Sequence, residues 1–173
     1  MKKVLLVLFI TLICATILFF FINERSFSPL GESDIKMLFP EQNIDIEKEC
    51  SVDFLGFNSK GELHEFYMYR LSNVSIDRSY PKFNGEWEKH KISNYDTVSK
   101  WKPCPIDSVD NDLFKFVFTT KDFNKKECSS TFYNELKKDG NYYSFFYFNE
   151  LEKYFLLYCP DSNTLYYVRQ KGF

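Results

Sequence analysis

The sequence has few of the residues from which enzyme active sites are usually built. It contains only two histidines, His64 and His90, and neither belongs to a nucleophile, zinc-protease, phosphate-loop or dinucleotide-binding motif. His64 lies within a predicted strand, and His90 lies within a charged stretch that we expect to face solvent. We therefore predict no catalytic residue, no metal site and no cofactor, and a protein that is not an enzyme. The alternative is an envelope hydrolase whose carboxylates come together only in the fold.

An excess of positive charge is also absent. The 173 residues include 22 lysines and arginines and 24 aspartates and glutamates, which gives a net charge of −2. Proteins that bind nucleic acid usually carry a basic patch or a strong overall positive charge. The charge balance therefore excludes nucleic acid as an expected partner.

What the sequence does have is a long run without charge near its N-terminus. Residues 4–22 are 19 uncharged positions, and a helix of that length measures about 28 Å, close to the hydrocarbon thickness of a bilayer. Signal-peptide cores are shorter and end at small residues, whereas this run ends in large aromatic and aliphatic side chains. We predict that residues 1–25 form a retained transmembrane helix whose partner is the lipid bilayer. A cleaved signal peptide and a lipoprotein signal with lipid on Cys14 are the alternatives, although bulky Ile13 precedes that cysteine.

The charges that flank the run predict its orientation. Lys2 and Lys3 precede it, whereas Glu24 and Arg25 follow it. The positive-inside rule then places the N-terminus in the cytoplasm. We expect a single-pass protein of the cytoplasmic (inner) membrane, with a linker at residues 26–32 and a periplasmic or extracellular domain at residues 33–173.

Four cysteines follow the predicted anchor, and they are far apart in sequence. Successive cysteines are separated by 54, 24 and 31 positions, which does not fit the close pairs of structural zinc sites. An even number of cysteines outside the cytoplasm predicts disulfides, and three pairings are open. The candidates are Cys50, Cys104, Cys128 and Cys159.

Hydrophobic patterning predicts an α+β domain. We expect an antiparallel β-sheet of about five to seven strands with one inserted helix, which follows the N-terminal transmembrane helix. The strands are expected at residues 51–57, 62–71, 86–92, 113–118, 142–148, 152–159 and 164–169, with a turn at 58–61 and a stiff extended segment at 101–105. The inserted helix is expected to begin at Ser129 or Ser130 and to run through Lys138, and a short helix capped by Ser33 is expected at residues 33–39.

Aromatic residues make up 20% of the chain, with 20 phenylalanines and 12 tyrosines. Several predicted strands are apolar on both faces, so the sheet needs cover on both sides. We expect the helix to cover one face, and the irregular middle of the chain or a partner to cover the other. Aromatic rings also occur at binding hot spots, so four of them are candidate binding residues, with core packing as the alternative. These are Tyr143, Tyr147, Trp87 and Trp101.

Together these features predict a membrane-anchored extracytoplasmic protein that acts as a non-catalytic protein-binding or envelope accessory module. Small anchored domains without catalytic residues also suit a second role, that of a periplasmic immunity protein that neutralises a toxin. An immunity protein would bind a single partner tightly, whereas an accessory protein would copurify with an envelope complex. The residues do not identify the partner in either case.

Overall fold

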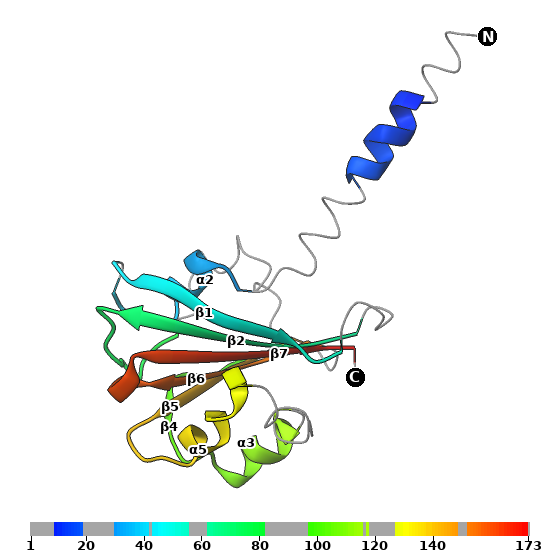
Figure 1. The fold of residues 1–173 in the computed structure, drawn as a ribbon. Helices are drawn as coiled ribbons and strands as arrows, with labels where there is room; N and C mark the ends of the chain where they lie inside the picture. Colours follow the sequence, from blue (N-terminus) through cyan, green and yellow to red (C-terminus); the bar gives the residue numbers. More distant parts are fainter. Residues whose placement is uncertain are drawn as a thin grey trace, which may run out of the picture. The chain divides into compact units, whose positions relative to one another are not determined.

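The computed structural model describes residues 9–18, 30–41, 43–55, 62–81, 97–115, 117, 127–148 and 152–172. The chain divides into two compact units, Met1–Gly31 and Glu32–Phe173. In the first unit, residues 9–18 are helical (Figure 1). Among the described residues, no helix is both long enough and apolar enough to span a bilayer. The two ends of the run expected to cross the membrane, residues 4–8 and 19–22, lie outside the described residues.

The second unit is built on an antiparallel sheet of seven strands (Figure 1). The strands are β1 (Asp45–Asp53), β2 (Leu63–Ser72), β3 (Thr97–Val98), β4 (Lys102–Pro103), β5 (Tyr142–Phe148), β6 (Glu152–Cys159) and β7 (Thr164–Lys171). They lie in the order β1-β2-β7-β6-β5-β3, and β4 pairs with β5 beside β3. The predicted α+β class and the predicted number of strands are confirmed.

The C-terminal strands match the sequence prediction closely. β5 and β6 have the predicted bounds, and β7 extends two residues beyond its predicted end. A 3-10 turn, η4 (Pro160–Ser162), joins β6 to β7, and Asn163 follows it with a left-handed φ of 52°. Asparagine adopts this conformation at low cost, so the predicted hairpin turn is confirmed.

The first hairpin begins earlier in the chain than predicted. β1 starts at Asp45 instead of residue 51, and it pairs with β2 with a register shift between Lys48 and Cys50. The turn expected at residues 58–61 and the strand expected at 86–92 lie outside the described residues. β1 is an edge strand that exposes most of its side chains, so charged residues are tolerated where a central strand would exclude them.

The strand predicted at residues 113–118 is wrong, because residues 113, 115 and 117 are helical. The helix α3 (Ser108–Leu113) begins after Asp107, whose side chain accepts a hydrogen bond from the Asp110 backbone N–H. Phe114 and Val117, which follow three residues apart, are fully buried. This helical spacing places both buried side chains on one side of the segment.

The single inserted helix is replaced by several short ones. After α3 come a 3-10 turn, η3 (Glu127–Ser129), and α5 (Phe132–Leu136). The N-cap of α5 is Thr131 instead of a serine, and its side chain makes no capping hydrogen bond. We expected Phe132, Tyr133 and Leu136 to lie on the inner side of this helix; Phe132 and Leu136 are buried, whereas Tyr133 is only partly buried against the core. At the start of the unit, α2 (Glu32–Lys36) begins one residue before the predicted cap, Ser33.

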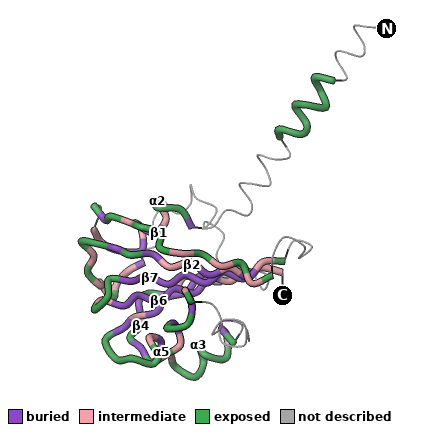
Figure 2. Tube along the Cα trace, viewed as in Figure 1, coloured by how far each residue is buried: buried purple, intermediate pink, exposed green. Residues whose placement is uncertain are grey.

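Both faces of the sheet are covered, as the aromatic strands require. α3 and α5 lie on one face, where they contribute to the main core (Figures 1 and 2). On the other face, Phe39 packs against Trp101 and Tyr158 at ring-centroid distances of 5.4 and 5.3 Å. The Trp101 indole N–H also donates to the Leu38 carbonyl at 2.9 Å. The segment that follows α2 therefore supplies cover that we had assigned to the middle of the chain or to a partner.

Candidate functional site

A charged network joins α3 to β4 and β5. It consists of Lys102, Asp107, Asp110 and Tyr143, and we call it the α3 network. The Lys102 Nζ lies 2.5 Å from an Asp110 carboxylate oxygen and 3.7 Å from an Asp107 oxygen. The Tyr143 hydroxyl donates to the same Asp110 oxygen at 2.8 Å. Asp110 is buried at 5% exposure, and these two donors balance the cost of enclosing its charge.

The electrostatics of the α3 network favour a structural role. The pKa of the Asp107 carboxyl lies below its usual value, chiefly because this group accepts a hydrogen bond from the Asp110 backbone N–H. The hydrogen bond from Tyr143 and the charge of Lys102 lower it further. Burial raises the pKa of Tyr143, and the hydrogen bond to Asp110 raises it further. Tyr143 therefore keeps its proton, and both Lys102 and Tyr143 contact the Asp110 carboxylate. The arrangement fixes the start of α3 against the sheet, because each polar group is already bound within the network.

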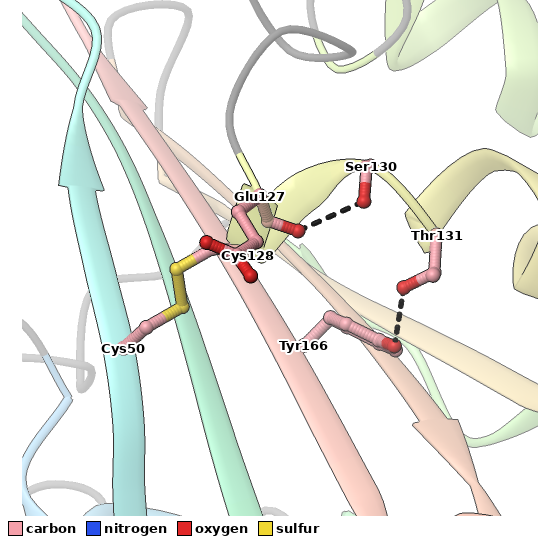
Figure 3. The surroundings of a disulfide bond; sticks show 6 residues. All are labelled: Cys50, Glu127, Cys128, Ser130, Thr131 and Tyr166. Atoms are coloured by element: carbon pink, nitrogen blue, oxygen red, sulfur yellow. Dashed lines mark hydrogen bonds between the residues drawn. A yellow bond between two sulfur atoms is a disulfide. The ribbon is translucent and has the colours of Figure 1, made fainter.

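A disulfide joins Cys50 of β1 to Cys128 of η3 (Figure 3). The two Cα atoms are 6.3 Å apart, and 78 positions separate the cysteines in sequence. Close to the bridge, Thr131 and the Tyr166 hydroxyl are within hydrogen-bond distance at 3.1 Å. The bridge thus ties the edge strand to the helical layer, and the prediction of disulfides is confirmed for this pair.

Cys104 and Cys159 remain buried thiols, so the expectation that all four cysteines pair is wrong. The Cys104 N–H donates to the Asn141 carbonyl at 2.9 Å. The register of β5 and β6, with Tyr142 opposite Tyr158, places Cys159 on the other side of Asn141. The two cysteines therefore flank one strand, which separates their Cα atoms by about 9.6 Å at ordinary strand spacing. Disulfides require about 4.4–6.8 Å.

The environment of these two thiols also keeps them unreactive. Burial raises the pKa of Cys104 to about 12, and nearby Asp139 and Glu135 contribute to the rise. Burial likewise raises the pKa of Cys159, with the Glu135 carboxylate as the next cause. The thiolate is the reactive form of cysteine, and it is scarce at neutral pH when the pKa is this high.

The structure places two of the four candidate binding rings in the interior. Trp101 and Tyr143 are only 2% and 1% exposed, and they pack in the two layers that cover the sheet. For Tyr147 the structure describes the backbone alone, within β5, and Trp87 lies outside the described residues. The binding role expected for Tyr147 and Trp87 thus stays a prediction, whereas Trp101 and Tyr143 serve as core residues in this fold.

Of the two histidines, the structure describes His64. Its ring is buried near the ring of Phe54, with 5.1 Å between the centroids. Burial lowers the pKa of His64 to about 4, and the negative charge of Asp53 opposes this effect only in part. At neutral pH the imidazole is therefore uncharged. His90 lies outside the described residues.

A stacked row of tyrosines, which the sequence analysis did not predict, lies on the face opposite α3 and α5. We call it the tyrosine ladder, and its rings come from β2, β7 and β6. Neighbouring centroids are 6.2, 5.2 and 5.9 Å apart, and the planes of neighbours differ by at most 19°. The members in order are Tyr69, Tyr67, Tyr167 and Tyr154. Only the strand register brings these rings into one row, so local patterning could not reveal it.

A buried ion pair accompanies the tyrosine ladder. The Arg169 guanidinium is fully buried, lies 3.5 Å from a Glu65 carboxylate oxygen and sits over the Tyr154 ring. The Tyr67 hydroxyl donates to the same Glu65 oxygen at 3.0 Å. Glu65 thus accepts from Tyr67 within the ladder and pairs with Arg169, which lies over the end of the ladder at Tyr154. This ion pair links β2 to β7 by charge as well as by backbone hydrogen bonds.

Among the strands whose burial the structure describes, β1 exposes the most residues. Six of its nine residues are exposed, and among the described strands it pairs with β2 alone. No three histidine, cysteine or acidic side chains gather to hold a metal ion in the part of the chain that the structure describes. No protein-family model, curated protein or solved structure matches the chain. The functional argument therefore rests on the residues of this chain.

Proposed function

We propose that the protein is a membrane-anchored extracytoplasmic module that binds another protein without catalysing a reaction. The uncharged run at residues 4–22, preceded by Lys2 and Lys3, supports an anchor in the cytoplasmic membrane with the N-terminus inside. The main observation that supports a domain outside the cytoplasm is the Cys50–Cys128 disulfide. Disulfides persist in oxidising compartments and are rare in the cytosol, so the bridge supports a domain that lies outside.

The accessible strand β1 supports the binding role. Binding through a sheet edge uses backbone groups that an edge strand leaves unpaired. The disulfide holds this strand to the helical layer, and preorganised surfaces lose less entropy when a partner binds. The α3 network, in contrast, uses its charged groups to hold the fold together.

Two forms of this function differ in stoichiometry and affinity. An immunity protein forms a tight complex with a single toxin, whereas an envelope accessory protein copurifies with a larger complex. Purification of the full chain from membranes in mild detergent, followed by measurement of complex mass and dissociation rate, distinguishes them. A one-to-one complex that dissociates over hours supports the immunity role.

The location is tested by a reporter and by thiol labelling. A reporter fused after Phe173 should be active outside the cytoplasm, and a matched fusion before residue 4 should be active only inside. In denatured protein without reductant, a maleimide should label Cys14, Cys104 and Cys159, and Cys50 and Cys128 should become labelled only after reduction. Cytoplasmic activity of the C-terminal fusion would overturn the proposed orientation.

A further inference from the structure

The edge strand β1 carries an unusual share of the charge of the protein. Its sequence DIEKECSVD holds four carboxylates and one lysine, a net charge of −3. The whole chain has a net charge of −2, so the rest of the chain is slightly positive. The strand lies at the outer edge of the sheet, where most of these side chains are exposed (Figures 1 and 2). The edge is therefore an acidic border on a domain that is otherwise close to neutral.

The strand is held in place from its inner side. Arg70 of β2 forms an ion pair with Glu49, and the Ser72 hydroxyl donates to Asp45 at 3.1 Å. The disulfide fixes Cys50 from the helical layer. These contacts come from β2 or from η3 and order the strand, and no described strand pairs with the outer backbone edge of β1.

The charge of the strand argues against a second copy of this chain as the occupant. If two β1 strands paired edge to edge, each would bring a net charge of −3 to the interface. Like charges on opposed strands destabilise the pair, and charged edges are a common protection against such self-association. A strand rich in lysine or arginine would instead find a carboxylate beside many of its positions.

We propose that the outer edge of β1 receives an extended basic segment of the partner protein, which adds to the sheet as an eighth strand. The inference rests on the proposed binding function and gives it a surface and a partner chemistry. Backbone hydrogen bonds along the open edge hold the segment, as in other complexes formed by strand addition. The carboxylates of β1 select lysine-rich or arginine-rich segments and reject acidic ones.

The first test uses defined peptides and the full-length chain in non-ionic detergent. The probes are a nonapeptide of alternating lysine and threonine, its counterpart with glutamate for lysine, and the basic peptide with alternate backbone nitrogens methylated. We expect the basic peptide to bind at least about tenfold more tightly than the other two, because only it offers both charge and backbone donors. Equal binding of the methylated peptide, or no measurable binding of the basic peptide, overturns the inference.

Charge reversals locate the binding surface. Glu47→Lys should weaken binding of the basic peptide about fivefold, because one close exposed charge pair is worth up to about 1 kcal/mol. Asp112→Lys on α3 and Asp161→Lys in the β6–β7 turn are matched controls, because both side chains are at least 70% exposed and lie on elements other than β1. The controls should change the affinity less than twofold. An equal loss in all three variants assigns binding to overall charge and overturns the inference.

Photocrosslinking in intact cells separates failure of this inference from failure of the proposed function. A photoreactive residue is placed at Lys48, at Asp112 or at Asp161 in the full chain. The inference is supported if position 48 forms adducts that are lost in the Glu47→Lys variant. The basic peptide, when added in excess, should also prevent these adducts. Adducts from the other positions alone overturn the edge site and leave a binding function in place. Absence of adducts from all three positions counts against the edge site and against the binding function together.

Discussion

Acidification should destabilise the second unit through His64. This side chain is 5% exposed, and burial lowers its pKa to about 4, whereas an unfolded chain gives histidine a pKa of about 6.5. Between these two pH values His64 is protonated in the unfolded chain and stays neutral in the folded domain. Stability is therefore fully present above pH 6.5 and falls as the pH drops toward 4.

The size of the loss follows from the two pKa values. Each pH unit between them is worth about 1.36 kcal/mol, so the full effect is about 3 kcal/mol, reached only below pH 4. At pH 5 the expected loss is about 2 kcal/mol. Small domains unfold with a free energy of about 5–15 kcal/mol, so this single residue is large enough to detect.

The assay is urea unfolding of the full-length chain in detergent at pH 7 and at pH 5, followed by the fluorescence of buried Trp101. His64→Gln removes the titrating imidazole and keeps the other ionisable groups, including His90 and the nearby Asp53. The parent chain should lose about 2 kcal/mol more than this variant between the two pH values. Asp53→Asn is a second control, because removing the opposing charge should leave the loss as large or larger. Equal losses in the parent and in His64→Gln would refute the reasoning.

Three further predictions concern stability. Removal of the disulfide by Cys50→Ser with Cys128→Ser should lower the free energy of unfolding by about 4 kcal/mol, because the bridge closes a loop of 78 positions. Urea unfolding without reductant measures this free energy, and an unchanged value would contradict the bridge. Phe155→Ala should cost about 3–5 kcal/mol in thermal unfolding, because the ring is fully buried among other core rings; a loss below about 1 kcal/mol would contradict that packing. Asp107→Ala should cost about 1 kcal/mol by loss of the α3 cap, which amide exchange in that helix reports, whereas unchanged exchange would exclude the cap.

The sequence predicted the C-terminal strands well because their signals are local. β5 and β6 are nearly continuous runs of aromatic and aliphatic residues, and a buried strand in the middle of a sheet requires such runs. The turn between β6 and β7 contains Pro160 and Asn163, whose backbone preferences suit a tight reversal. No distant part of the chain was needed to recognise this hairpin.

The segment around Phe114 was misread because two periods fit the same residues. Phenylalanines at alternate positions suggested a strand, yet Phe114 and Val117 have helical spacing. Asp107 caps α3, because its side chain accepts a hydrogen bond from the Asp110 backbone N–H. A search for N-caps in the sequence would therefore have predicted α3, which ends at Leu113 where the predicted strand was expected to begin.

Disulfide pairing could not be predicted, because it depends on sheet register. Cys104 and Cys159 both border β5, and the strand between them holds them too far apart to pair. Cys50 reaches Cys128 because β1 and η3 meet across the edge of the sheet. Both outcomes require contacts between residues far apart in sequence, and cysteine spacing carries no information about those contacts.

The charges of Asp45, Glu47 and Glu49 explain why the first part of β1 was not predicted from the sequence and why the strand is the candidate interface. A segment that alternates acidic and apolar residues irregularly, with a register shift at Lys48, resembles a loop when read locally. In the fold the same charges lie on an edge, where like charges disfavour pairing between two copies of the chain. A partner strand with positive charge would gain ion pairs at this edge in addition to backbone hydrogen bonds. The basic-peptide and Glu47→Lys measurements therefore test whether these charges protect the edge alone or also select what binds to it.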